Sequence, residues 1–107
     1  MAKLNAFEQA ALRDPDVQFG FNNYEMLKQV GEFVKEMRTQ GDLTQSVLQE
    51  MSGVSQADIS RLEKGAMERG PSLLTLVRLA HAAGKHLVIG LKDDSGDSNE
   101  LTQVLML

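Results

Sequence analysis

The sequence predicts a mostly α-helical fold of four helices, preceded by an N-terminal arm and followed by one β-strand. Between residues 24 and 84, apolar side chains recur at three- and four-residue steps, which is the period of a buried helix face. Gly53, Gly65 and Gly84 interrupt this period and divide the stretch into short helices. Residues 86–92 form instead a short apolar run that is typical of a strand.

Length and composition restrict the class of protein. The chain has 107 residues, of which 42% are hydrophobic, and this is enough for one domain with one core. No apolar run approaches the ~18 residues of a membrane span, the N-terminus lacks the apolar segment of a signal peptide, and cysteine is absent. We therefore expect a cytoplasmic protein without disulfides and without a cofactor.

The net charge of −4 does not by itself favour nucleic-acid binding, and no part of the chain is basic overall. Any contact with DNA must then come from a few well-placed side chains and from helix N-termini. An acidic chain also suits a basic protein partner.

Residues 1–23 are predicted to form an N-terminal arm. Residues 3–12 can be helical, and Asp14-Pro15 ends that helix because the residue before a proline avoids the α region. The domain proper is predicted over residues 24–92.

The first core helix runs from Tyr24 to the turn at Gly41-Asp42. Its predicted buried face consists of Leu27, Val30, Phe33, Val34 and Met37. The second helix begins at a Thr44 cap, ends near Ser52 and is expected to bury Leu48 and Met51.

The third helix begins at Ser55, where the Ser-x-x-Asp pattern resembles a capping box, and it stops at Gly65. Ile59 and Leu62 are its predicted core residues. A fourth helix is capped by Ser72 and closed by Gly84, with one apolar face formed by Leu73, Leu76, Val77 and Ala80.

Residues 86–92 are predicted as a lone strand, which cannot satisfy its own backbone hydrogen-bonding groups and needs a partner. A second copy of the chain is the simplest partner, and the predicted dimer seam is Leu87, Val88, Ile89 and Leu91. The alternative is pairing within the chain, against residues 17–21. Residues 93–107 are expected to be a flexible tail that begins with the acidic run DDSGDSNE.

Two short helices separated by a glycine turn carry the functional prediction. Gly53 supplies the positive φ that a steep crossing requires, and Val54 fills the space beneath the turn. The second helix of such a pair lies in the major groove of DNA, with its N-terminal residues at the base edges. Its predicted exposed face consists of Ser55, Gln56, Ala57, Ser60 and Arg61.

The chemistry of these side chains suits base recognition. A glutamine amide pairs with adenine, an arginine with guanine, and the Ala57 methyl group can touch a thymine methyl. Thr44 and Gln45 stand at the N-terminus of the preceding helix, where backbone amides meet phosphate. Lys64 and Arg69 can flank the duplex, or can equally be ordinary surface charges.

The run LTQSVLQEMSGVSQADISRLEKG, followed by PSLLTLVRLAHAAGK, resembles the Xre-type helix-turn-helix of Cro and phage repressors over about residues 33–84. The resemblance implies a lambda-repressor-like fold of four or five helices. It also implies DNA contacts from Gln45, Gln56, Ala57, Ser60 and Arg61. One position departs from the pattern, because Gln49 stands where the family usually has alanine. Its side chain must tilt outward, or the two helices must splay.

The wider layout is similar to that of HigA-like antitoxins of type II toxin-antitoxin pairs. The stretches that carry this similarity are residues 14–16 before the helices and residues 84–89 after them. HipB-like antitoxins similarly pair such a strand across a dimer. The resemblance implies a homodimeric repressor that binds a palindromic operator and neutralises a small basic toxin.

Two other functions stay open. One is a stand-alone phage or plasmid repressor. The other is a protein-interaction module that has lost DNA binding, and the acidity of the chain and Gln49 favour this module.

An enzyme is not expected, since there is no phosphate loop, no paired acids and no nucleophile with a placed base. His81 and His86 are too few ligands for zinc, so no metal site is predicted. Glu63 is expected to be the ion partner of Arg38.

Overall fold

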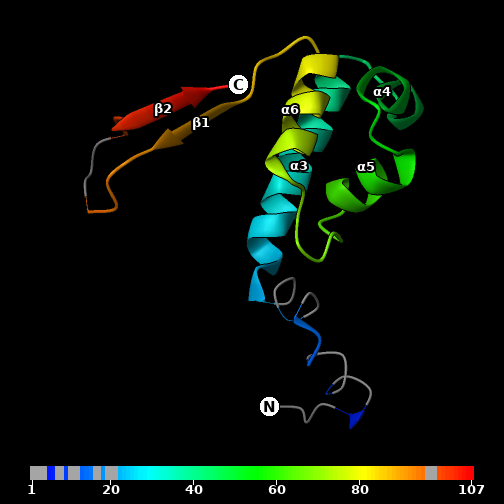
Figure 1. Ribbon diagram of the computed structural model, residues 1–107, viewed down its shortest axis with the longest axis vertical. Coiled ribbons are helices and arrows are strands. Elements are labelled where there is room, and N and C mark those ends of the chain that lie inside the picture. The colour runs from blue at the N-terminus through cyan, green and yellow to red at the C-terminus, as the bar shows by residue number, and fades with distance from the viewer. Residues whose placement is uncertain (1–4, 7–8, 10–12, 16–17, 19–21, 96–98) are drawn as a thin grey trace.

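The computed structural model describes residues 5–6, 9, 13–15, 18, 22–95 and 99–107. Its helices are α3 (Tyr24–Gln40), α4 (Gln45–Ser52), α5 (Gln56–Glu63) and α6 (Leu73–Ala82), and its strands are β1 (Val88–Leu91) and β2 (Gln103–Met106) (Figure 1). The mostly α-helical fold with four core helices is confirmed. No helix among the described residues has the length and apolarity that a membrane span requires.

The predicted caps define where the short helices begin and end. Thr44, Ser55 and Ser72 each accept a hydrogen bond from the backbone N–H three residues later, at 3.0 to 3.1 Å. Gly53 (φ 76°) and Gly84 (φ 74°) follow α4 and α6 in the left-handed conformation, as the sequence indicated. Local side-chain chemistry therefore sets the helix boundaries.

The core lies where α3, α4, α5 and α6 meet, and its most deeply buried side chains are Val34, Leu48, Ile59, Leu62 and Leu79. Helices α3 and α5 approach closely at Gly31. A Cβ atom at that position would lie 2.3 Å from the carbonyl oxygen of Leu62. The missing side chain thus allows α5 to pack directly against the backbone of α3.

Three residues predicted in the core are exposed instead. Phe33 is 54% exposed because α3 turns Gly31 toward α5 and places Leu27, Val34 and Met37 in the interior. Met51 is exposed because Ser52 turns inward, donating its hydroxyl to the carbonyl of Leu48 at 2.6 Å. In α6, Leu79 is fully buried and Leu73 is 48% exposed.

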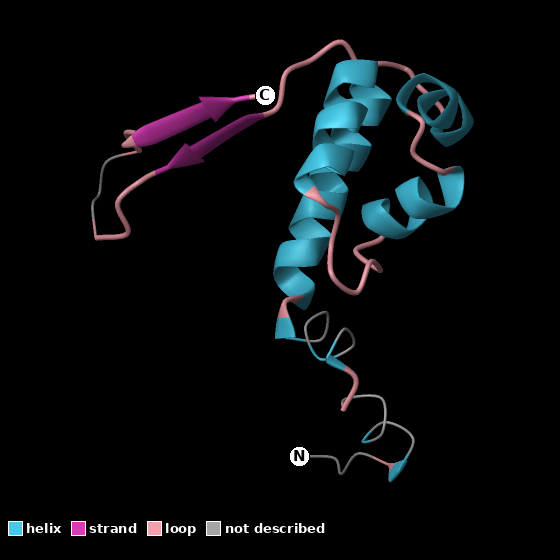
Figure 2. Cartoon of the chain, viewed as in Figure 1, coloured by secondary structure: helices cyan, strands magenta, loops and turns pink. Residues whose placement is uncertain are grey.

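The predicted strand has its partner within the same chain. β1 pairs antiparallel with β2, with Ile89 opposite Leu105. The sequence expected one strand followed by a flexible tail, so the second strand corrects that expectation for residues 103–106. The alternative partner, residues 17–21, lies outside the described residues except for Gln18. The polar residues 93–100 form the connection between the two strands, and the apolar residues after them run back along β1 and pair with it. The hairpin projects away from the helices (Figure 2).

Candidate nucleic-acid interface

Helices α4 and α5 form the predicted helix-turn-helix. Gly53 ends α4, and Val54 lies beneath the turn with 8% of its surface exposed. The Ser52 hydroxyl accepts a hydrogen bond from the Val54 backbone N–H at 3.1 Å, which holds the turn from inside. The core residues Ile59 and Leu62 fix the inner face of α5.

The outer face of α5 carries the predicted DNA-contacting residues. Ser55, Gln56, Ala57 and Arg61 are exposed there, whereas Ser60 is half-buried. Lys64 caps the C-terminal end of the helix and is exposed, and Arg69 is exposed in the loop that follows. The structure therefore brings five predicted contacts and Lys64 together on one helix and places Arg69 beyond it.

Arg61 forms an ion pair with Asp58, one turn earlier on the same helix. The side chain of Arg61 is 61% exposed and that of Asp58 is 40% exposed, so both lie on the outer surface. The sequence identified Asp58 only as part of a capping box. Its backbone N–H does bond to Ser55, but its carboxylate takes the guanidinium of Arg61.

At the N-terminus of α4, Thr44 is exposed and its hydroxyl caps the helix. Gln45 is half-buried, and its side-chain Nε2 donates to Glu63 Oε1 at 3.3 Å. One end of the Gln45 side chain is thus held by the protein, while the rest of α4's first turn faces outward.

Glu63 and Arg38 form a buried pair behind this interface, as predicted. Arg38 Nε and Nη2 donate to the two carboxylate oxygens of Glu63 at 2.7 and 2.8 Å, and Nη1 donates to the carbonyl of Leu43 at 2.9 Å. Burial opposes ionisation of Glu63, but the hydrogen bonds from Arg38 and Gln45 and the nearby positive charges lower its pKa. The hydrogen bond to Glu63 likewise raises the pKa of Arg38. Both groups are therefore charged at neutral pH.

Gln49, the departure from the Xre pattern, tilts outward and is exposed. Its Oε1 accepts a hydrogen bond from the backbone N–H of Gln56 at 2.6 Å. The Gln49 side chain in α4 therefore reaches across the Gly53 turn and caps the N-terminal end of α5. Sequence reasoning missed this role because the two residues belong to different helices.

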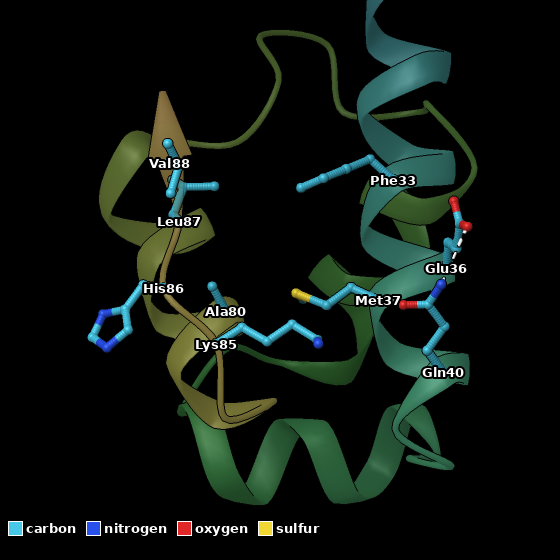
Figure 3. Close-up of a pocket in the computed structure, with 9 residues that line it drawn as sticks. All are labelled: Phe33, Glu36, Met37, Gln40, Ala80, Lys85, His86, Leu87 and Val88. Atoms are coloured by element: carbon cyan, nitrogen blue, oxygen red, sulfur yellow. Dashed lines mark hydrogen bonds between the residues drawn. The ribbon is translucent and has the colours of Figure 1, made fainter. Parts of the chain in front are cut away.

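The predicted dimer residues divide into two groups. Leu87 is buried in the chain's own core, whereas Val88, Ile89 and Leu91 are exposed on the hairpin. A hollow of about 310 Å³ lies between α3 and the start of β1. In it Phe33 extends toward Leu87 and Met37 toward Ala80 on the opposite wall, and His86 turns away (Figure 3).

His81 and His86 lie side by side, with ring centroids 5.4 Å apart. The Nε2 atom of His81 is 2.9 Å from the carbonyl oxygen of Leu107. Within the described part of the chain, three or more potential metal ligands gather nowhere.

Comparison with known proteins agrees with this geometry. A family model described as helix-turn-helix matches residues 34–89, more than half of the chain. The chain is also similar to the crystal structure of C.AhdI, a restriction-modification controller protein from Aeromonas hydrophila, with 31% identity and a TM-score of 0.54. That similarity covers 58% of this chain and 91% of C.AhdI. No curated protein matches the chain. By its matched residues and its α4–turn–α5 geometry, the chain belongs to the helix-turn-helix family, whose members are DNA-binding regulators of transcription.

Proposed function

We propose that this protein is a sequence-specific transcriptional repressor that binds a palindromic operator as a homodimer. The observation that carries the proposal is the outer face of α5, where Gln56, Ala57 and Arg61 are exposed while the inner face of the helix is buried in the core. The similarity to C.AhdI, which is named as a controller protein, supports a regulatory role.

In the proposed complex, α5 lies in the major groove. Gln56 pairs with adenine, Arg61 with the O6 and N7 atoms of guanine, and Ala57 packs on a thymine methyl. Thr44, Gln45 and the first backbone amides of α4 contact phosphate, and Lys64 and Arg69 flank the groove. Ser55 and Ser60 add hydroxyl groups beside the bases.

The hairpin supports the homodimer. Val88, Ile89, Leu91, Val104, Leu105 and Met106 are each between 37% and 69% exposed, on both faces of a two-stranded sheet. An isolated hairpin of this kind has little stability of its own in water. In Figure 1 the hairpin lies on the other side of α3 and α6 from α5, so a second copy can cover it and leave both recognition helices open.

The test is selection of bound duplexes from a random-sequence library, followed by titration of the selected site. Arg61→Ala is expected to weaken binding to that site by about 1–3 kcal/mol and to relax the preference at one base pair. Lys92→Ala, which removes the same charge from the exposed residue that follows β1, is the control and is expected to leave the preference unchanged. Enrichment of no sequence by the intact protein would contradict the proposal.

A second candidate function is that of an antitoxin that also represses its own operon. The acidic excess of the chain, 15 Asp and Glu against 11 Lys and Arg, supports it because such a surface suits a small basic toxin. Co-expression of the tagged chain with the adjacent gene tests it. A small basic protein that co-purifies supports the antitoxin role. Binding of the upstream DNA with nothing co-purified supports a stand-alone repressor.

A further inference from the structure

The charges of the recognition helix are all neutralised within the protein. Helix α5 contains three charged side chains: Asp58 and Arg61 pair with one another, and Glu63 pairs with Arg38. The face that would enter the groove therefore has no net charge of its own. Attraction to phosphate must come from Lys64 and the helix N-termini, and not from Arg61 acting as a free cation.

The pair between Asp58 and Arg61 differs from that between Glu63 and Arg38. Glu63 is buried with 3% of its side chain exposed, so its role is structural, whereas Asp58 and Arg61 both reach the surface. An exposed pair of this kind contributes little to folding stability. Its consequence lies instead in where it holds the guanidinium group.

Only the Nη2 atom of Arg61 is engaged by Asp58. The guanidinium is planar and carries five N–H donors, so four remain when one N–H of Nη2 is taken by Asp58. Among these four is still an adjacent pair that matches O6 and N7 of guanine. A long, exposed arginine otherwise samples many rotamers and can equally well reach phosphate. The carboxylate restricts this freedom and directs the remaining donors outward from α5.

We infer that Asp58 is a specificity-determining residue, which positions Arg61 to bind guanine and prevents it from acting as a general phosphate-binding cation. The inference rests on the proposed function and adds to it the device by which one base is selected. Asp58 acts through Arg61 and is therefore a positioning residue. The operator half-site must contain a guanine within reach of the second turn of α5.

A double-mutant cycle on the ratio of non-specific to specific Kd tests the inference. The probes are the duplex selected by the intact protein and a scrambled duplex of the same length and composition. Asp58→Asn is expected to tighten binding to the scrambled duplex and to lower the ratio about threefold or more. The slope of log Kd against log salt concentration for the scrambled duplex is expected to increase by about one, as for one more phosphate contact. Arg61→Ala is expected to lower the ratio about tenfold.

The second arm of the cycle separates positioning from simple charge. In the Arg61→Ala background, Asp58→Asn is expected to shift both Kd values equally and leave the ratio unchanged. Asp94→Asn removes the same charge from an exposed position after β1 and is expected to leave the ratio unchanged as well. Because Ser55 caps the backbone N–H of Asp58 and not its side chain, the variant keeps the helix start.

Replacing each guanine of the selected site by 7-deazaguanine identifies the atom that is bound. One replacement is expected to weaken DNA binding by the intact protein about tenfold. The same replacement is expected to weaken binding by the Asp58→Asn variant less, and binding by the Arg61→Ala variant not at all. An unchanged specificity ratio in Asp58→Asn would overturn the inference while leaving the proposed function intact. So would a lost preference at a cytosine, because Asp58 would then contact the base itself. Selection of no sequence by the intact protein would overturn both.

Discussion

Arg38 and Glu63 connect the first helix of the domain, α3, to the end of α5. The ion pair is bidentate, and Arg38 also donates a hydrogen bond to the carbonyl of Leu43, just before α4. Gln45, a predicted DNA contact, bonds to the same carboxylate. One buried pair therefore links the positions of α3, α4 and α5.

Removing one partner of this pair is expected to be costly. Arg38→Ala leaves the Glu63 carboxylate buried without its main partner, and we expect the free energy of unfolding to fall by about 3 kcal/mol. Chemical denaturation measures it. The double variant Arg38→Met with Glu63→Leu is the control, because it removes both charges and is expected to recover most of the loss. A loss below about 1 kcal/mol in the single variant would contradict this view of the pair.

The same pair makes stability depend on pH. The pKa of Glu63 is lower in the folded protein than its ordinary value, so folding favours the ionised form. Its contribution is fully present above the pKa of the unfolded chain, about 4.3, and is lost as pH falls through the lower folded pKa. Unfolding free energy measured from pH 7 down to pH 3 is expected to fall more steeply in the intact protein than in Glu63→Gln. Parallel curves would contradict this.

At the scale of elements, the contact between α3 and α5 depends on a glycine. Gly31 is buried, and its backbone faces the carbonyl oxygens of Leu62 and Glu63. This contact sets the rotation of α3, and with it the exposure of Phe33. At the opposite end of α5, Gln49 of α4 accepts a hydrogen bond from the backbone N–H of Gln56, in the first turn of that helix.

Gly31→Ala tests the packing of these two helices. Alanine normally favours a helix over glycine by about 1 kcal/mol, but here its methyl group would meet backbone that cannot easily move. We expect a net loss of about 1–3 kcal/mol in the free energy of unfolding. Gly41→Ala is the matched control, because its Cβ would lie 3.6 Å from its nearest neighbours. A stabilised Gly31→Ala variant would show that the helices are free to separate.

At the scale of the whole molecule, the helical body and the hairpin differ in how they are stabilised. The body has a shared core, whereas the hairpin is joined to it mainly through Leu87 and Leu107. Of the hairpin, only the start of β1 at Val88 lines the hollow between α3 and β1 (Figure 3). This arrangement is what the proposed dimer would cover.

A charge placed on the hairpin is expected to separate the proposed dimer. Ile89→Asp and Leu105→Asp introduce carboxylates at positions that face each other in register, where burial of an unpaired charge is unfavourable. Sedimentation velocity is expected to show a dimer for the intact protein and a monomer for each variant. Lys92→Asp places the same carboxylate at an already polar position and should remain dimeric. A monomeric intact protein would contradict the proposal.

Much of the site was predictable because its determinants are local. The caps at Thr44, Ser55 and Ser72 act within three residues, and a left-handed glycine acts at its own position. The sequence alone was therefore enough to place α4, the turn and α5, and to indicate which side of α5 is buried.

What the tertiary structure decided depends on residues far apart in the chain. The inward turn of Gly31 depends on the backbone of α5, and the partner of β1 comes from the end of the chain. The bonds from Gln45 to Glu63 and from Gln49 to Gln56 likewise join different helices. The spacing of apolar residues along a helix limits its buried face only to a broad arc of the helix surface. The alternation of apolar and polar residues along a strand does not identify the strand with which it pairs. Close packing between elements selects one arrangement from those that the local pattern allows.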